Sequence, residues 1–145
     1  FNEAKQILDH RNSKEDPYIN EKLSLKHDEL GEMYFRYFRY DEALEQYYKA
    51  LTLSEDKPKY SFKVVECYVK RGETNKAIKL LKELIAAYPA LLAARLRLGQ
   101  LYYDLKQMTY AVEQWEIILD RQPDNPPALR YLRAAQNVES TNLSL

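Results

Sequence analysis

Side chains able to do nucleophilic or metal chemistry are few and far apart in this sequence. It has one cysteine, Cys67, and two histidines, His10 and His27, among 145 residues. Neither histidine has a second ligand at helical spacing, as a zinc site requires, and Cys67 has no nearby histidine to activate it. No glycine-rich phosphate loop is present. We therefore expect no enzyme, metal site or cofactor, with Cys67 as a buried thiol and His27 as a partly buried structural side chain.

A second group with possible chemistry interleaves aromatic rings with arginines. It consists of Tyr34, Phe35, Arg36, Tyr37, Phe38, Arg39 and Tyr40. In single-stranded RNA sites such rings stack on bases while arginines contact phosphates. Tyr34, however, recurs at a fixed position along the chain, and most of the others lie around a turn, where rings can join neighbouring helices. RNA binding is therefore the weaker alternative.

The element that must position these side chains is a unit of 34 residues. Residues of one kind recur at this period: Tyr34, Tyr68 and Tyr102; Ala43, Ala77 and Ala111; Leu30, Val64, Leu98 and Leu132; Pro89 and Pro123. A fixed period of this length predicts stacked helical hairpins, each too small to bury its apolar side alone. With only 3 glycines and few alternating apolar runs, the fold is expected to be all-α.

The period divides the chain into six segments. These are an N-terminal helix and loop (1–23), three repeat units (24–57, 58–91 and 92–125), a capping helix (126–138) and a flexible tail (139–145). Within the first segment, residues 2–10 predict a short amphipathic helix, either the end of an upstream unit or a cap. Residues 18–23 are expected to extend the following helix backward.

In the first repeat unit, apolar spacing indicates which side of each helix packs. Leu30, Met33, Tyr34 and Tyr37 follow the i, i+3, i+4, i+7 spacing of a one-sided helix and predict its buried side. Asp41 is placed to cap the second helix. In the second unit, Gly72 suits a left-handed helix stop.

Charge and address are less informative. The net charge is zero, but residues 24–57 are acidic and residues 58–91 basic, which could orient a charged partner; the alternative is solvated outer faces. No apolar run approaches the ~18 residues of a membrane span. The start has neither an initiator methionine nor a signal-peptide pattern, so we expect an excised fragment or processed form. One cysteine is compatible with the cytosol, and a cytoplasmic location is the expectation.

The recurring positions resemble those of the tetratricopeptide repeat. The third unit matches best, with Leu98, Gly99, Tyr102, Ala111, Trp115 and Pro123; the first supplies Leu30, Gly31, Tyr34, Ala43, Tyr47 and Ala50. The departures are Glu55 in place of proline and Val65 in place of glycine. The resemblance implies a right-handed superhelical solenoid of three such units. It also implies a concave groove, lined by the first helices, that binds a peptide or partner protein without chemistry of its own.

The resemblance further implies which residues line that groove. They are Asp28, Glu32 and Phe35 in the first unit; Lys59, Phe62, Lys63, Glu66 and Val69 in the second; and Ala93, Leu96, Arg97, Gln100 and Tyr103 in the third. Exposed apolar side chains on such a wall usually mark an interaction site. We expect an adaptor or scaffold whose partner segment carries apolar anchors and a basic residue facing Glu32 and Glu66.

Some family members grip a chaperone's C-terminal carboxylate with a lysine, asparagine and arginine clamp. The matching positions here hold Asp28, Glu32, Lys63, Ala93 and Arg97, of which only Arg97 fits the pattern. The two acidic residues would repel a carboxylate, so this partner is disfavoured. A further alternative is a homo-oligomer that assembles through residues 1–16 or through the tail.

Overall fold

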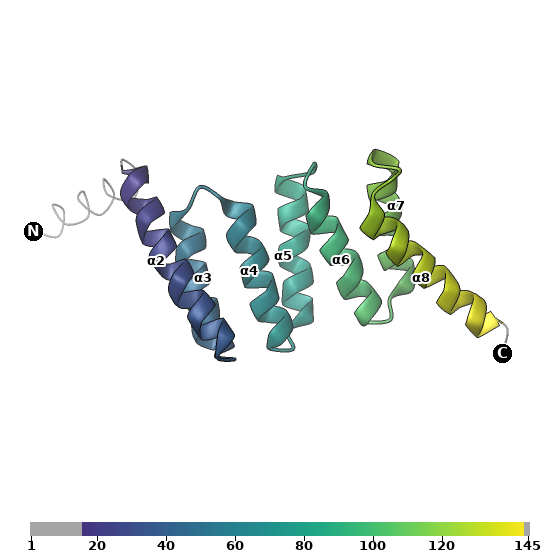
Figure 1. The fold of residues 1–145 in the computed structure, drawn as a ribbon, viewed down its shortest axis with the longest axis horizontal. Helices are drawn as coiled ribbons and strands as arrows, with labels where there is room; N and C mark the ends of the chain where they lie inside the picture. Colours follow the sequence, from purple (N-terminus) through teal and green to yellow (C-terminus); the bar gives the residue numbers. More distant parts are fainter. Residues whose placement is uncertain (1–15, 144–145) are drawn as a thin grey trace, which may run out of the picture. The chain divides into compact units, whose positions relative to one another are not determined.

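The computed structural model describes residues 16–143, with side chains through residue 138. Over this range the chain folds into seven α-helices and no strand (Figure 1), so the fold is all-α. The helix predicted for residues 2–10 lies outside the described residues. None of the described helices combines the length and apolar character needed to cross a membrane.

The helices follow one another as antiparallel hairpins. They are α2 (Pro17–Arg36), α3 (Tyr40–Leu53), α4 (Lys57–Lys70), α5 (Thr74–Ala87), α6 (Leu92–Asp104), α7 (Met108–Arg121) and α8 (Pro126–Leu143). The chain forms two compact units, residues 1–77 and 78–145, with the boundary inside α5. From here on, "the first unit" and "the second unit" mean these two compact units and not the 34-residue repeats. In the first unit α2 packs against α3 and α3 against α4, and in the second α6 packs against α7 and α7 against α8.

Three helices begin with a proline and a capping side chain. The carboxylate of Asp16 accepts the amide hydrogen of Ile19 at 3.1 Å, and that of Asp56 accepts the amide of Lys59 at 3.2 Å. Asn125 accepts the amide of Ala128 at 3.0 Å. Proline fits here because the first helical turn has no intrahelical partner for its amide hydrogen. Sequence-local rules therefore set where α2, α4 and α8 begin.

The turn inside each hairpin uses a left-handed residue. Gly72 has φ 78°, as its sequence position indicated, and the residues one period away on either side, Phe38 and Lys106, have φ 64° and 61°. After each of them, an amide hydrogen bonds back across the turn, as from Arg39 to the Tyr34 carbonyl at 2.9 Å. This is the six-to-one bond of a Schellman helix end. The turns are equivalent although only one contains glycine.

The core pairs small residues on one helix with large ones on the next. In the first unit Ala43, Ala50, Val64 and Val65 are fully buried. In the second unit Ala111 and Ile118 are fully buried, and Trp115 and Leu101 are almost so. Alanines allow the helices to approach closely, and the larger side chains fill the space opposite.

The predicted packing side of the first helix is wrong for three of its four residues, and only Tyr34 is half-buried. Leu30 and Met33 are 41% and 40% exposed, and Tyr37 is 68% exposed, whereas α2 buries Ser24, Asp28 and Gly31. Their counterparts on α4, Val64 and Cys67, are fully buried. The difference arises because α3 packs against α4, while no described helix occupies the corresponding place beside α2.

α2 begins at Pro17, which confirms that residues 18–23 extend the first helix of the first repeat backward. Two other features differ from the sequence analysis. α8 continues to Leu143, past the end predicted at residue 138, because no glycine or proline interrupts residues 139–143. Asp41 does not cap α3, which begins at Tyr40 with Arg39 before it. Asp41 instead lies in the first helical turn, where its charge favours the helix dipole, and it pairs with Arg71 at 3.2 Å.

Candidate functional site

A small hollow opens in the first unit among α2, α3 and α4. It has a volume of about 220 Å³ and is lined by Phe35, Tyr47, Phe62, Lys63 and Glu66. Two phenylalanines and the tyrosine ring give it a mostly apolar wall, with one cation and one carboxylate at its edge. Four of the five lining residues belong to the predicted groove, and they come from two different helices.

Tyr47 forms the back of this hollow because a glycine faces it. A Cβ atom on Gly31 would stand 2.5 Å from the Cε1 atom of Tyr47, so no larger residue fits without displacing the ring. The ring is 4% exposed. Burial, and to a lesser degree the nearby acidic groups, raises the pKa of the Tyr47 hydroxyl. Tyr47 is therefore a neutral, fixed wall.

Charged side chains beside the hollow neutralise one another. The Lys63 ammonium donates to Asp28 and, at 2.9 Å, to Glu32, while Lys59 lies 3.8 Å from the other Asp28 oxygen. The hydrogen bond and charge of Lys63 lower the pKa of Glu32. Burial lowers the pKa of Lys63, but the bonds to Asp28 and Glu32 outweigh it and leave the pKa raised. The ammonium is thus held charged and engaged.

A larger hollow of about 420 Å³ opens in the second unit. Its lining comes from α6, α7 and α8: Arg97, Gln100, Tyr103, Asp104, Trp115, Tyr131 and Ala134. Trp115 stacks on Tyr131 with ring centroids 5.5 Å apart and planes 23° apart, and Tyr103 lies 6.1 Å from it. Three aromatic rings therefore line this hollow, beside the polar side chains of Arg97, Gln100 and Asp104.

Polar atoms in the second hollow form a short chain. An Arg97 nitrogen donates to the Gln100 side-chain oxygen at 3.2 Å, and the Gln100 amide donates to the Tyr131 hydroxyl. The Trp115 ring nitrogen is buried without a hydrogen-bond partner, because it faces Gly99, where an added Cβ would clash with it. Arg97, Gln100 and Tyr103 are the predicted groove residues that the fold brings together here.

The two hollows occupy the same place in the repeat, 68 residues apart. Gly31, Phe35, Tyr47, Lys63 and Glu66 correspond to Gly99, Tyr103, Trp115, Tyr131 and Ala134. The contact of Lys63 with Glu32 thereby corresponds to the contact of Tyr131 with Gln100. Likewise, Lys63 lies over the Tyr47 ring at 5.4 Å, where Tyr131 stacks on Trp115.

Not every predicted groove residue lines a hollow. Asp28, Glu32 and Lys59 do not line the first hollow but form ion pairs beside it, Lys59 with Asp28, and Lys63 with both Asp28 and Glu32. Val69, Ala93 and Leu96 line neither of the two hollows. The residues missed by sequence reasoning are Tyr47, Asp104, Trp115, Tyr131 and Ala134. The period could have found Tyr131 and Ala134, since they follow Arg97 and Gln100 by 34 residues.

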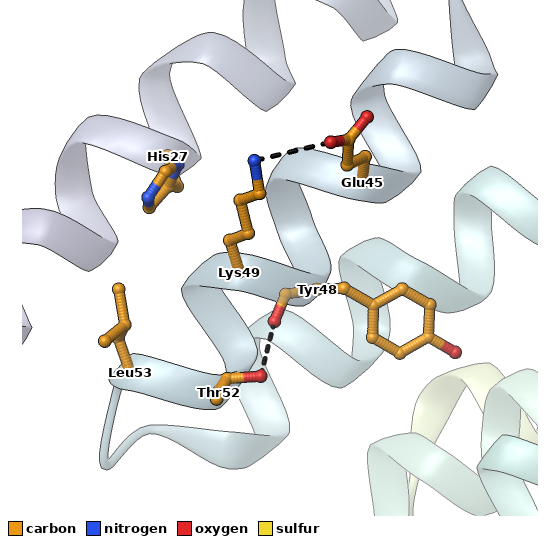
Figure 2. Close-up of a pocket in the computed structure, with 6 residues that line it drawn as sticks. All are labelled: His27, Glu45, Tyr48, Lys49, Thr52 and Leu53. Carbon is orange, nitrogen blue, oxygen red and sulfur yellow. Dashed lines mark hydrogen bonds and ion pairs between the residues drawn. The ribbon is translucent and has the colours of Figure 1, made fainter. Parts of the chain in front are cut away.

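A third depression, of about 530 Å³, lies between α2 and α3 (Figure 2). Its polar groups satisfy one another: Lys49 pairs with Glu45 at 3.3 Å, and Thr52 donates to the Tyr48 carbonyl at 3.0 Å. His27 is held at 2.7 Å from Gln46. His27 is partly buried, as predicted.

The described residues contain little that could react. Cys67 is buried, as predicted, and burial raises the pKa of its thiol to about 12, so the thiolate is scarce at neutral pH. No group of three or more histidine, cysteine or acidic side chains within the described residues could hold a metal ion. The arrangement offers shaped apolar surface with polar edges, which suits recognition of another molecule.

Comparison with known sequences identifies one family. The sequence profile of the tetratricopeptide repeat matches residues 34–91 and again residues 70–135. A search of curated protein sequences found no match.

Solved structures show the same fold. The first tetratricopeptide domain of Spaghetti (RPAP3), bound to the HSP90 peptide SRMEEVD, is 22% identical with a TM-score of 0.67, covering 83% of this chain and 95% of that one. The TPR2AB domain of yeast Sti1 in complex with pHSP90 is 22% identical with a TM-score of 0.73, covering 83% and 49%. The second such domain of human RPAP3, with the HSP70 peptide SGPTIEEVD, is 19% identical with a TM-score of 0.64, covering 83% and 98%.

Proposed function

The chain belongs to the tetratricopeptide repeat family, and we propose that it is an adaptor that binds a peptide segment of a partner protein in a groove lined by the first helices of its repeats. Domains of this family are non-catalytic protein-interaction modules.

One observation carries the location. Phe35, Phe62, Lys63 and Glu66, which the family resemblance assigned to the groove, lie together around a single hollow in the first unit. The equivalent place in the second unit is again a hollow, with Tyr103 at the position of Phe35. A hollow that recurs at the same repeat positions supports a similar side-chain contact in each unit.

The lining supports apolar anchors together with a basic residue. Aromatic walls in both hollows favour aliphatic or aromatic side chains, which carry most of the affinity when they fill a pocket. Glu66 lies at the edge of the first hollow and Asp104 at the edge of the second. A carboxylate beside each apolar wall favours a cation next to the anchor, which sets direction more than affinity.

The same geometry disfavours an acidic C-terminal tail of the kind seen with the structural relatives. Lys63 is the cation nearest the first hollow, and it already bonds to Asp28 and Glu32. An incoming carboxylate would have to displace one of these and would then face the other. Ala93, at a further clamp position, supplies no charge.

Peptide display on the whole chain tests the location. Selection from a random peptide library should enrich sequences with an aliphatic or aromatic residue next to lysine or arginine. Phe62→Glu should abolish binding of the enriched peptides, since it places a charge in the hollow, whereas the matched variant Val138→Glu, on exposed α8 surface, should bind normally. Equal binding by both variants, with helical content unchanged, would place the peptide elsewhere.

A titration tests the chemistry. The peptide SRMEEVD should show no saturable binding to the wild-type chain. It should gain binding in the variant Asp28→Asn, Glu32→Gln, which frees Lys63 from both carboxylates. Saturable binding to the wild type that is lost on Lys63→Ala would overturn the proposed preference.

A further inference from the structure

Large apolar side chains that reach solvent are concentrated on one helix. Of thirteen such exposed residues in the described part of the chain, eight lie on α2 or in the turn after it: Tyr18, Ile19, Leu23, Leu25, Leu30, Met33, Tyr37 and Phe38. Exposed apolar side chains concentrated in this way mark a docking surface. It is separate from the two hollows, so its occupant is a separate question from the proposed peptide.

Five of these side chains follow the spacing of a coiled-coil seam. Ile19, Leu23, Leu30, Met33 and Tyr37 are separated by alternating steps of four and three residues, with Lys26 filling the remaining place. Each is at least 40% exposed. Alternation of this kind places the side chains along one line that a second helix can cover by knobs-into-holes packing. At 20 residues, α2 is also the longest described helix.

The register of the repeat shows that a helix belongs on this side. The counterparts of Leu30 and Met33 are Val64 and Cys67, both fully buried. They are covered because α3 packs against α4. The exposed side of α2 is therefore shaped to pack against a helix.

We propose that the helix covering this side is α2 of a second copy of the chain, running antiparallel. In an antiparallel pair with Leu30 opposite Met33 of the other copy, Glu29 lies beside Arg36 of the other copy, and the two-fold axis repeats each contact. The ion pairs of the described residues include neither Glu29 nor Arg36, although the charge of Arg36 acts on Glu32 of its own chain and lowers the pKa of that carboxyl. The antiparallel alignment that brings the apolar residues of the two α2 helices together therefore also brings their opposite charges together.

Lys26 selects this arrangement over a parallel one. A parallel pair in register would place Lys26 against Lys26, a repulsion at the centre of the seam. The antiparallel offset places Lys26 opposite the Tyr37 ring, where a cation is attracted. It also sets Leu23 over the turn of the other copy that carries Phe38, which is 78% exposed.

The overlap runs from residue 26 to residue 37, which is about 18 Å of helix. So short a seam predicts a reversible dimer. The two-fold axis closes the assembly, so no longer polymer follows.

Analytical ultracentrifugation of the full chain tests the dimer. The mass should rise with concentration from 17.2 kDa to twice that value and no further. The variant Leu30→Glu, Met33→Glu should remain monomeric at concentrations at least about a hundredfold higher, since it puts charges in the seam. Its thermal midpoint at low concentration should match the wild type, and Val138→Glu should dimerise normally.

Charge exchange tests the register. Glu29→Arg and Arg36→Glu should each raise the dissociation constant about tenfold. Mixing these two variants should restore association at the wild-type strength, and so should the double exchange in one chain. A chain that is monomeric throughout, with a lower thermal midpoint in the Leu30→Glu, Met33→Glu variant, would mean that residues of the same chain cover α2. A dimer indifferent to both charge exchanges would overturn the antiparallel register.

Discussion

The two hollows occupy one place in the repeat but use different chemistry. In the first unit, the residue on the third helix is Lys63, which bonds to Glu32 and lies over Tyr47. In the second unit the same position is Tyr131, which bonds to Gln100 and stacks on Trp115. The contacts are conserved within the molecule while ions are replaced by neutral groups. The repeat therefore fixes which positions touch, and residue type then decides what each hollow can bind.

The difference predicts unequal dependence on the central ring. Trp115→Ala removes a fully buried indole and its stacking on Tyr131, and should lower the free energy of unfolding by about 3–5 kcal/mol. Tyr47→Ala should cost less, since the ring removed is smaller. Urea unfolding followed by far-UV circular dichroism measures both. A loss below about 1 kcal/mol for Trp115→Ala would mean that the aromatic stack does not stabilise the second unit.

The stability of the first unit should fall when one partner of the ion pairs beside the first hollow is removed alone. Lys63→Ala leaves the buried Asp28 carboxylate with only Lys59, 3.8 Å away. The free energy of unfolding should fall by about 2–3 kcal/mol. This is at or below the lower end of the range for a fully buried ion pair, because the Lys63 side chain is 25% exposed.

A matched exchange of chemistry separates charge from position. The variant Asp28→Leu, Glu32→Gln, Lys63→Tyr gives the first unit the residues found 68 positions later, at Leu96, Gln100 and Tyr131. It should unfold at a urea concentration close to that of the wild type, since no buried charge is stranded. A loss as large as that of Lys63→Ala would show that the two sites are not interchangeable.

The glycines that face the central rings should be equally intolerant. Gly31→Ala and Gly99→Ala each force a Cβ against Tyr47 or Trp115. Overpacking should cost about 1–3 kcal/mol, partly offset by the ~1 kcal/mol that alanine gains over glycine inside a helix. Thermal unfolding of the two variants measures the net loss. Stabilisation by either substitution would mean that the ring moves aside freely.

Acid should slightly lower the stability of the first unit, because protonation of Glu32 breaks its ion pair with Lys63. The second hollow has Gln100 in place of Glu32 and should not respond in this way. Since Lys63 lowers the pKa of Glu32 below its ordinary 4.5, the ion pair stabilises the fold above about pH 4.5 and is lost as pH falls through the lower, folded-state value. Glu32 is 53% exposed, so the contribution is below about 1 kcal/mol. Glu32→Gln should flatten the acid side of the stability curve by that amount. An unchanged curve would remove the pair from the stability of the unit.

Contacts that depend only on the position of a residue in the repeat can be inferred from the 34-residue period. Gly31 faces Tyr47 and Gly99 faces Trp115 because both pairs sit at the same two places in the unit. The predicted groove residues Phe35, Phe62 and Lys63 meet for the same reason.

What the sequence could not predict depends on neighbours. Apolar spacing marks a side of α2, but only a packed helix would bury it, so Leu30 and Met33 were misassigned. The hydrogen bond between Lys63 and Asp28 joins residues 35 positions apart. The sequence around each residue does not indicate that the two charges will pair with one another. Phe38 and Lys106 lack the glycine that announces a left-handed turn.

Phe38 has a consequence for how the molecule tolerates change. A left-handed backbone costs a residue with a side chain about 1–2 kcal/mol, a cost that glycine avoids at the equivalent Gly72. Phe38→Gly should therefore make the protein harder to unfold, even though it deletes an aromatic ring. Directed evolution for heat resistance alone would remove this residue early. At this turn the protein is less stable than it would be with glycine, and a large aromatic ring is exposed to solvent.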